Sequence, residues 1–345
     1  MGIAYVTNED TDNVSVIDIK THRVIATIPV GNLDFPSDIE ITPDGKLLYV
    51  AVGNENFVTV IDTKTHSVIA TVPVGLDPDT VVITSDGKLA YISNADSDNV
   101  SVIDVKTHRV IATIPVGDLD FPSDMEVTPD GELLYFAVGN ENFVTVIDTK
   151  TQSIIATVPV GRDPDTVVIT PDGKLAYISN EITNDVSVID TKVHRVIATI
   201  PVGGDIDRPG AMVIIPDSKL LYVAVGNDNF IGVIDTKTHS VIATVPVGRN
   251  PINFVITPDE QFVYVANEGD SNISVIDTKT HLVIATVFVG GLDIPIKMAI
   301  TPDGQLLYVP NHDVGTVTVI DTKTHSVIAT IPVGDGPRSV VINPN

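Results

Sequence analysis

The sequence is dominated by one unit that occurs eight times, at spacings of 42 to 45 residues. The motif V/I-x-V-I-D marks each copy, and all eight tyrosines occupy a single position of the unit. The motif ends at Asp18, Asp62, Asp104, Asp148, Asp190, Asp235, Asp277 and Asp321. Residues 54–75 and 140–161 differ at only two positions, so either pairs of units were duplicated recently or the chain is partly idealised. Repeats of this length fold as supersecondary units that stack on their neighbours.

Each unit contains the pattern of four short strands. Val, Ile, Thr and Tyr dominate the apolar runs, and Gly, Pro, Asn and Asp separate them. The P-D-G turns favour a glycine with positive φ. No segment shows the apolar period of a helix long enough to form. Four-stranded units of about 40 to 50 residues, repeated eight times, indicate a β-propeller.

We therefore predict an all-β fold, a single eight-bladed β-propeller of four-stranded antiparallel blades over residues 1–345. The chain starts with a second strand and ends with a lone first strand, so the C-terminal inner strand should close the ring by pairing with the N-terminal three strands. The predicted blades are 337–343 plus 3–31, then 36–75, 78–117, 122–161, 164–203, 209–248, 251–290 and 295–334.

The composition excludes several classes of function. The chain has no cysteine, which excludes disulfides, thiolate metal sites and a cysteine nucleophile. With 45 acidic and 20 basic residues the net charge is −25, which argues against binding nucleic acid. The longest apolar runs are too short to span a bilayer, so we expect no membrane insertion. We also expect no signal peptide, because Met1 leads almost directly into the first strand.

One tetrapeptide carries a family resemblance. Tyr5-Val6-Thr7-Asn8 has near copies at 91–94, 177–180, 264–267 and 308–311, whereas the equivalents at 49–52, 135–138 and 222–225 end in valine. With the recurring V-I-A-T and T-P-D-G patterns, the sequence resembles the YVTN β-propeller repeat family of surface-layer proteins. The resemblance covers the whole chain, and it implies a propeller and an extracellular or cell-surface location. Members of that family commonly have seven blades, so eight would be a departure.

The acidic residues are predicted to gather on one face. The loops between outer and inner strands, and those between second and third strands, should share a face that carries nearly all the net charge. Either these residues serve as turn formers and aid solubility, or the face binds cations or a basic partner. The loops that contain Asp10, Asp12, Asp96 and Asp98 alternate oxygen ligands as calcium sites do, although Asx turns explain them equally.

The predicted channel mouth is a second candidate site. Its acidic residues are Asp38, Glu40, Asp79, Asp124, Glu126 and Asp165. Its basic residues are Arg208, Lys297 and Arg338. Such an asymmetric mouth would hold a small ligand or a divalent cation such as calcium, unless these charges pair with one another across the ring.

Catalytic signatures are scarce. Seven of the eight histidines lie in repeated K-T-H or V-H turns, one per unit, and we expect them to be exposed. No inner strand contains histidine, and no Ser-His-Asp arrangement is present. We therefore predict a non-enzymatic rigid scaffold or interaction module at a microbial cell surface, which binds a protein or cell-surface component. The alternative is a metal-dependent hydrolase or lyase, resembling propeller lactonases, with its metal at Asp38, Glu40, Asp124 and Glu126. A third reading is a partly idealised repeat protein without a native ligand.

Overall fold

The computed structural model describes residues 2–31, 35–117, 124–203, 209–290 and 297–344. Within these ranges the chain forms eight four-stranded antiparallel sheets, and its helical turns are short 3₁₀ segments. The predicted all-β, eight-bladed propeller is confirmed. Two compact units divide the chain: unit 1 comprises Met1–Thr113 and Val287–Asn345, and unit 2 comprises Ile114–Thr286.

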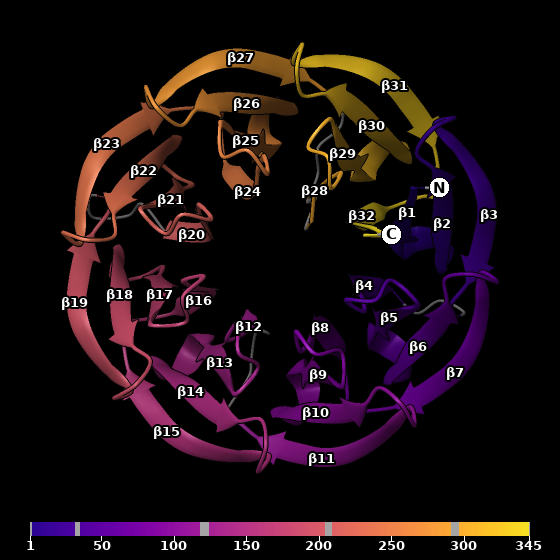
Figure 1. Ribbon diagram of the computed structural model, residues 1–345, viewed down its shortest axis with the longest axis horizontal. Helices are drawn as coiled ribbons and strands as arrows, with labels where there is room; N and C mark the ends of the chain where they lie inside the picture. Colours follow the sequence, from indigo (N-terminus) through magenta and orange to yellow (C-terminus); the bar gives the residue numbers. More distant parts are fainter. Residues whose placement is uncertain (1, 32–34, 118–123, 204–208, 291–296, 345) are drawn as a thin grey trace. The chain divides into compact units, whose positions relative to one another are not determined.

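Unit 1 holds the blades from both ends of the chain (Figure 1). Given from the first to the fourth strand, they are β32 (Pro337–Ile342), β1 (Ile3–Asn8), β2 (Asn13–Asp18) and β3 (Arg23–Pro29); β4 (Pro36–Ile41), β5 (Leu47–Val52), β6 (Phe57–Asp62) and β7 (Ser67–Pro73); β8 (Pro78–Ile83), β9 (Leu89–Asn94), β10 (Asn99–Asp104) and β11 (Arg109–Pro115); and β28 (Ala299–Ile300), β29 (Leu306–Asn311), β30 (Thr316–Asp321) and β31 (Ser326–Pro332). The first strands of neighbouring blades lie in contact, β28 beside β32, β32 beside β4 and β4 beside β8.

Unit 2 holds the blades from the middle of the chain. They are β12 (Met125–Val127), β13 (Leu133–Val138), β14 (Phe143–Asp148) and β15 (Ser153–Pro159); β16 (Pro164–Ile169), β17 (Leu175–Asn180), β18 (Asp185–Asp190) and β19 (Arg195–Pro201); β20 (Pro209–Ile214), β21 (Leu220–Val225), β22 (Phe230–Asp235) and β23 (Ser240–Pro246); and β24 (Pro251–Ile256), β25 (Phe262–Asn267), β26 (Asn272–Asp277) and β27 (Leu282–Phe288). Its first strands are also in contact, β12 with β16, β16 with β20 and β20 with β24.

The predicted joining of the two chain ends is confirmed. Strand β32 pairs antiparallel with β1, with Ala4 opposite Ile342 and Val6 opposite Val340. One blade is therefore built from both termini, so its sheet depends on residues more than 300 positions apart in the sequence.

The core lies between successive blades. The second strand of each blade is apolar over nearly its whole length because its two faces pack against different sheets. In β5, for example, Leu48 and Val50 pack in the cluster shared with β1 and β2, whereas Tyr49 packs in the cluster shared with β9. All eight tyrosines are fully buried at this level.

The turns follow the chemistry that the sequence predicts. In the T-P-D-G-K turn, Asp44 accepts hydrogen bonds from the Thr42 hydroxyl at 2.8 Å and the Lys46 amide at 3.1 Å. Gly45 has φ of 68°, which confirms the predicted positive φ. The 3₁₀ segments η1 (Glu9–Thr11), η2 (Gly53–Glu55), η3 (Ala95–Ser97), η4 (Gly139–Glu141), η5 (Glu268–Asp270) and η6 (His312–Val314) follow second strands.

The expectation that the turn histidines are exposed is wrong. His108, in the K-T-H turn after β10, is only partly exposed, and its Nδ1 lies 3.0 Å from the hydroxyl of Tyr49 in the neighbouring blade. Tyr135 and His194 repeat this contact at 3.0 Å in unit 2. The turn thus reaches the next sheet and links two blades.

Candidate functional site

In unit 1 the predicted acidic residues meet a lysine. Lys297 Nζ lies 2.6 Å from Glu40 Oε2 and 3.8 Å from Asp38 Oδ1. Asp38 Oδ2 also accepts a hydrogen bond of 3.2 Å from the amide of Val81 on β8. Lys297 is placed by a parallel bridge to Ser339 on β32. The internal charge pairing that the sequence left open therefore holds for these carboxylates.

A second ion pair lies beside the first strands of unit 1. Arg338 Nη1 contacts Glu9 Oε1 at 3.0 Å, and His312 Nε2 lies 3.5 Å from the other oxygen of Glu9. Burial raises the pKa of Asp79 to about 6; the positive charge of Arg338 opposes this shift, and the negative charge of Asp38 adds to it. These groups form a charge-compensated network within the unit.

In unit 2 the corresponding carboxylates cap the backbone of the next blade. Asp124 Oδ2 accepts a hydrogen bond of 3.3 Å from Val167, and Glu126 Oε2 accepts one of 2.6 Å from Ile169 on β16. Desolvation of the carboxyl group raises the pKa of Glu126 to about 8, and the nearby charge of Asp124 adds to the shift. Glu126 thus keeps its proton to a higher pH than an ordinary glutamate does.

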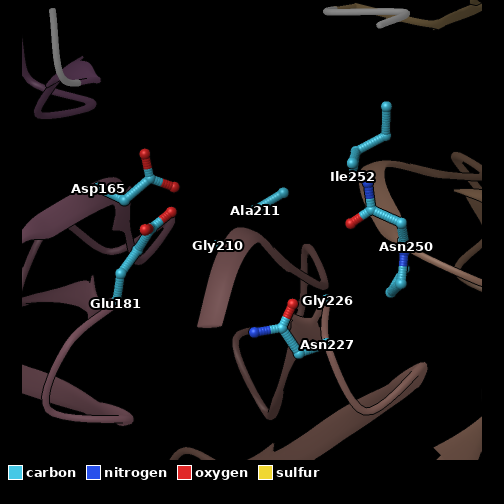
Figure 2. Close-up of a pocket in the computed structure, with 9 residues that line it drawn as sticks. Asp165, Glu181, Gly210, Ala211, Gly226, Asn227, Asn250 and Ile252 are labelled. Atoms are coloured by element: carbon cyan, nitrogen blue, oxygen red, sulfur yellow. The ribbon is translucent and has the colours of Figure 1, made fainter. Parts of the chain in front are cut away.

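A cavity of about 300 Å³ opens in unit 2 where three successive first strands begin (Figure 2). It is lined by Asp165 on β16, Glu181 after β17, Gly210 and Ala211 on β20, Gly226 and Asn227 after β21, and Asn250, Pro251 and Ile252 at β24. Figure 2 shows the carboxyl groups of Asp165 and Glu181 on one side and the side chains of Asn250 and Ile252 on the other, with Ala211 between them.

The acids of this cavity differ from an ordinary surface pair. Burial raises the pKa of Asp165, and the charge of Asp163 adds to the shift, while a hydrogen bond of 3.1 Å from the Thr166 hydroxyl opposes it. Two hydrogen bonds hold Asn250 at the cavity edge. Its side-chain Nδ2 donates to the carboxylate of Glu268, and its backbone amide donates to the side-chain oxygen of Asn229 at 3.0 Å. The site therefore combines a carboxyl group with a raised pKa, a second carboxyl group and two amide side chains, of which that of Asn250 is hydrogen-bonded in place.

The sequence prediction identified only part of this cavity. Asp165 was predicted, whereas Glu181, Asn227 and Asn250 were missed. Asp38, Glu40 and Asp79 belong to unit 1, and Asp124, Glu126 and Asp165 belong to unit 2. The signal that could have located the cavity is the small pair Gly210-Ala211, which stands where the earlier copy has Ser37-Asp38.

The loops considered for calcium have the geometry of turns. Asp10 and Asp96 lie within the 3₁₀ segments η1 and η3, and Asp12 and Asp98 end these segments in the left-handed conformation. Among the residues that the structure describes, no group of three or more His, Asp or Glu side chains is placed to hold a metal ion. The calcium loops and a metal at Asp38, Glu40, Asp124 and Glu126 therefore stay predictions. Arg208 lies outside the described residues.

Several predictions about the setting of the protein remain untested. In the described part of the chain, no helix has the length and apolar character needed to cross a membrane. The binding partner and the cell-surface location stay predictions.

The sequence matches one family model, described as "Lactonase, 7-bladed beta-propeller", over residues 1–114 and 149–283. All nine lining residues of the cavity fall in the second matched segment. No curated protein matches the chain. The surface-layer assignment and the prediction of a non-enzymatic scaffold gain no support from these comparisons.

Solved structures with the same architecture include two enzymes. Hydrazine synthase of Kuenenia stuttgartiensis is 25% identical with a TM-score of 0.68, over 83% of this chain and 95% of that one. Dihydro-heme d1 dehydrogenase NirN, solved in complex with DHE, is 18% identical with a TM-score of 0.85, over 99% and 75%. A functionally unknown protein from Desulfotomaculum acetoxidans DSM 771 is 17% identical with a TM-score of 0.69, over 99% of both chains. The last two similarities concern the fold alone.

The family match covers most of the sequence, and it includes every residue of the cavity. The family is described as seven-bladed, whereas this chain forms eight four-stranded sheets. The chain belongs to the lactonase family of β-propellers and is an eight-bladed member of it.

Proposed function

We propose that the protein hydrolyses a small lactone in the cavity of unit 2. The observation that carries this proposal is the pairing of Asp165 and Glu181 in one cavity of about 300 Å³, inside the segment matched to the lactonase family. Membership of that family supports the lactonase-like alternative over the scaffold. Every step is assigned here to side chains that line the cavity.

The two carboxyl groups have complementary roles. Glu181 acts as the general base: it accepts a proton from a water molecule whose oxygen attacks the lactone carbonyl carbon. The bond between that carbon and the ring oxygen then breaks, and the Asp165 carboxyl donates its proton to the ring oxygen. The products are the ring-opened hydroxy acid and an enzyme whose proton has moved from Asp165 to Glu181. Exchange with solvent restores the starting state.

The raised pKa of Asp165 is what suits it to the acid role. An ordinary aspartate is ionised near neutral pH and has no proton to donate, whereas burial keeps a larger fraction of Asp165 protonated. Activity should therefore fall as the pH rises and Asp165 loses its proton.

The test is lactone hydrolysis by Asp165→Asn and Glu181→Gln variants, followed with a pH indicator. Each substitution should lower kcat by about 10²- to 10⁴-fold, the usual contribution of a general acid or base. Asp79→Asn is the matched control, because Asp79 holds the same repeat position in unit 1 and does not line this cavity. Full activity of Asp165→Asn, or no hydrolysis of any lactone by the wild type, would refute the proposal.

A further inference from the structure

The cavity exists at a position where the repeats diverge. Two residues after a proline that recurs in every repeat, the four longer repeats carry Asp38, Asp124, Ala211 and Lys297. The side chains of Asp38 and Asp124 extend to the neighbouring first strand and accept hydrogen bonds from its backbone amides. Ala211 has only a methyl group, so the volume that a carboxylate fills in those two copies stays open here.

Two glycines keep the same space clear. A Cβ added at Gly210 would lie 3.5 Å from Asp165 Oδ2, and one added at Gly226 would lie 3.2 Å from Asn250 Oδ1. A side chain at position 226 would therefore press on Asn250, whereas one at position 210 would meet Asp165 at an ordinary van der Waals distance and take up volume in the cavity that Gly210 lines. The cavity wall is made of small residues where the polar side chains need room.

The polar lining consists of carboxyl groups and amides. Asp165 and Glu181 supply the former, Asn227 and Asn250 the latter, and none of the described lining residues is basic. Carboxyl and amide groups donate to and accept from hydroxyl groups. A phosphate or carboxylate on the ligand would instead bring a second negative charge beside Glu181 and near Asp163, which is unfavourable in a partly desolvated site.

We propose that this cavity takes an uncharged, hydroxyl-bearing lactone, that it excludes phosphorylated or carboxylated ones, and that Gly210 and Ala211 are the residues that admit the ring. The inference rests on the proposed function for the reaction, but it concerns binding. The hydroxyl groups of a neutral sugar-type lactone can form hydrogen bonds with the carboxyl and amide groups of the lining, and such a ligand brings no charge into the cavity. The replacement of Ser-Asp by Gly-Ala thus sets both the size and the charge of the accepted ligand.

The first experiment measures binding of D-gluconolactam, an uncharged ring that is not hydrolysed as a lactone is, and of its 6-phosphate, by titration calorimetry. The neutral lactam should bind at least tenfold more tightly at low ionic strength, and added salt should narrow the difference because it screens the repulsion. Equal or tighter binding of the phosphorylated compound would overturn the inference.

The second experiment restores the residue that the repeats use elsewhere. Ala211→Asp should fold, since Asp38 and Asp124 occupy the same position in their blades. It should weaken lactam binding at least tenfold without lowering the melting temperature. Ala211→Asn separates volume from charge, and it too should weaken binding if filling the space is what matters. Undiminished binding by both variants would show that Ala211 does not admit the ligand.

The two proposals fail differently. Lactam binding with the predicted preference, but no hydrolysis of the corresponding lactone, would refute the proposed function and leave the ligand class standing. Hydrolysis that depends on Asp165 and Glu181 but favours a phosphorylated lactone would refute the ligand class and leave the proposed function standing.

Discussion

Replacing Glu126 by glutamine tests whether a single side chain makes the stability of this propeller depend on pH. Glu126 and Glu40 hold the same position in two copies of the duplicated repeat. Glu40 forms an ion pair with Lys297 at 2.6 Å, whereas Glu126 accepts a 2.6 Å hydrogen bond from a backbone amide. Glutamine can accept the same hydrogen bond and cannot ionise. The substitution therefore measures how much the ionisation of Glu126 lowers the free energy of unfolding.

The magnitude follows from the pKa. Burial raises the pKa of Glu126 from 4.5 to about 8, so the folded protein holds this proton more tightly than the unfolded chain does. Between these two pH values the free energy of unfolding should fall as pH rises, and above the upper one the loss should be complete. At about 1.4 kcal/mol per pKa unit the upper bound is about 5 kcal/mol. The partial exposure of Glu126 reduces this to a few kcal/mol.

The assay is urea unfolding of wild type and Glu126→Gln at pH 5, 7 and 9, followed by the fluorescence of the eight tyrosines, since the chain has no tryptophan. The two proteins should be similarly stable at pH 5, and the variant should be more stable by a few kcal/mol at pH 9. Glu40→Gln is the matched control: it removes an ion pair, so it should destabilise at pH 7. Parallel stability curves for wild type and Glu126→Gln from pH 5 to 9 would refute the reasoning.

Three further substitutions test the packing and the charge network by urea unfolding. Tyr49→Phe removes the hydroxyl group that contacts His108, and it should cost about 1 to 2 kcal/mol; an unchanged midpoint would show that this contact does not link the blades. Gly75→Ala places a Cβ 2.7 Å from Asn94 and should cost about 1 to 3 kcal/mol, part of which Asn94→Ala should restore. Lys297→Met leaves two carboxylates without their cation, so it should destabilise the protein at pH 7; an unchanged midpoint would show that this ion pair does not stabilise the fold.

The sequence was sufficient for the architecture because the relevant signals are local and repeated eight times. The T-P-D-G turn defines its own hydrogen bonds, as Thr42, Asp44 and Gly45 show. The pairing of β32 with β1 followed from counting strands at the two termini. Where one copy has an ambiguous pattern, the other seven copies show which strands and turns to expect, and a non-repetitive chain does not offer this comparison.

Features that join two blades were harder to predict. Tyr49 and His108 are 59 residues apart, and each lies in a segment that has a sufficient local explanation, a strand for the tyrosine and a turn for the histidine. The sequence pattern therefore predicted, wrongly, that the histidine is exposed. For Lys297, Asp38 and Glu40, the sequence located the charged residues near one another but could not choose between an ion pair and a ligand site. That choice depends on the contact of β28 with β32 and of β32 with β4.

The cavity of unit 2 was harder still, because a missing side chain marks it. Motif searches look for reactive residues, and they found Asp165 but gave no weight to Gly210 and Ala211. The cavity also takes its lining from three successive blades, so no single repeat contains it. Comparing equivalent positions among the repeats would have identified Ala211 as the smallest side chain at this position.

The repeats separate the residues that maintain the fold from those free to change. The fully buried tyrosines and the apolar second strands hold neighbouring sheets together in every blade, and they vary little between copies. The position two residues after the repeated proline varies more: in the longer repeats it holds an aspartate that accepts a hydrogen bond from the next strand, a lysine that pairs with acids, or an alanine that lines a cavity. Since the surrounding backbone is set by the conserved core, one substitution at this position changes the local chemistry without rebuilding the blade. A single copy with a small side chain at this position can thus give a repeat protein a cavity that its other copies lack.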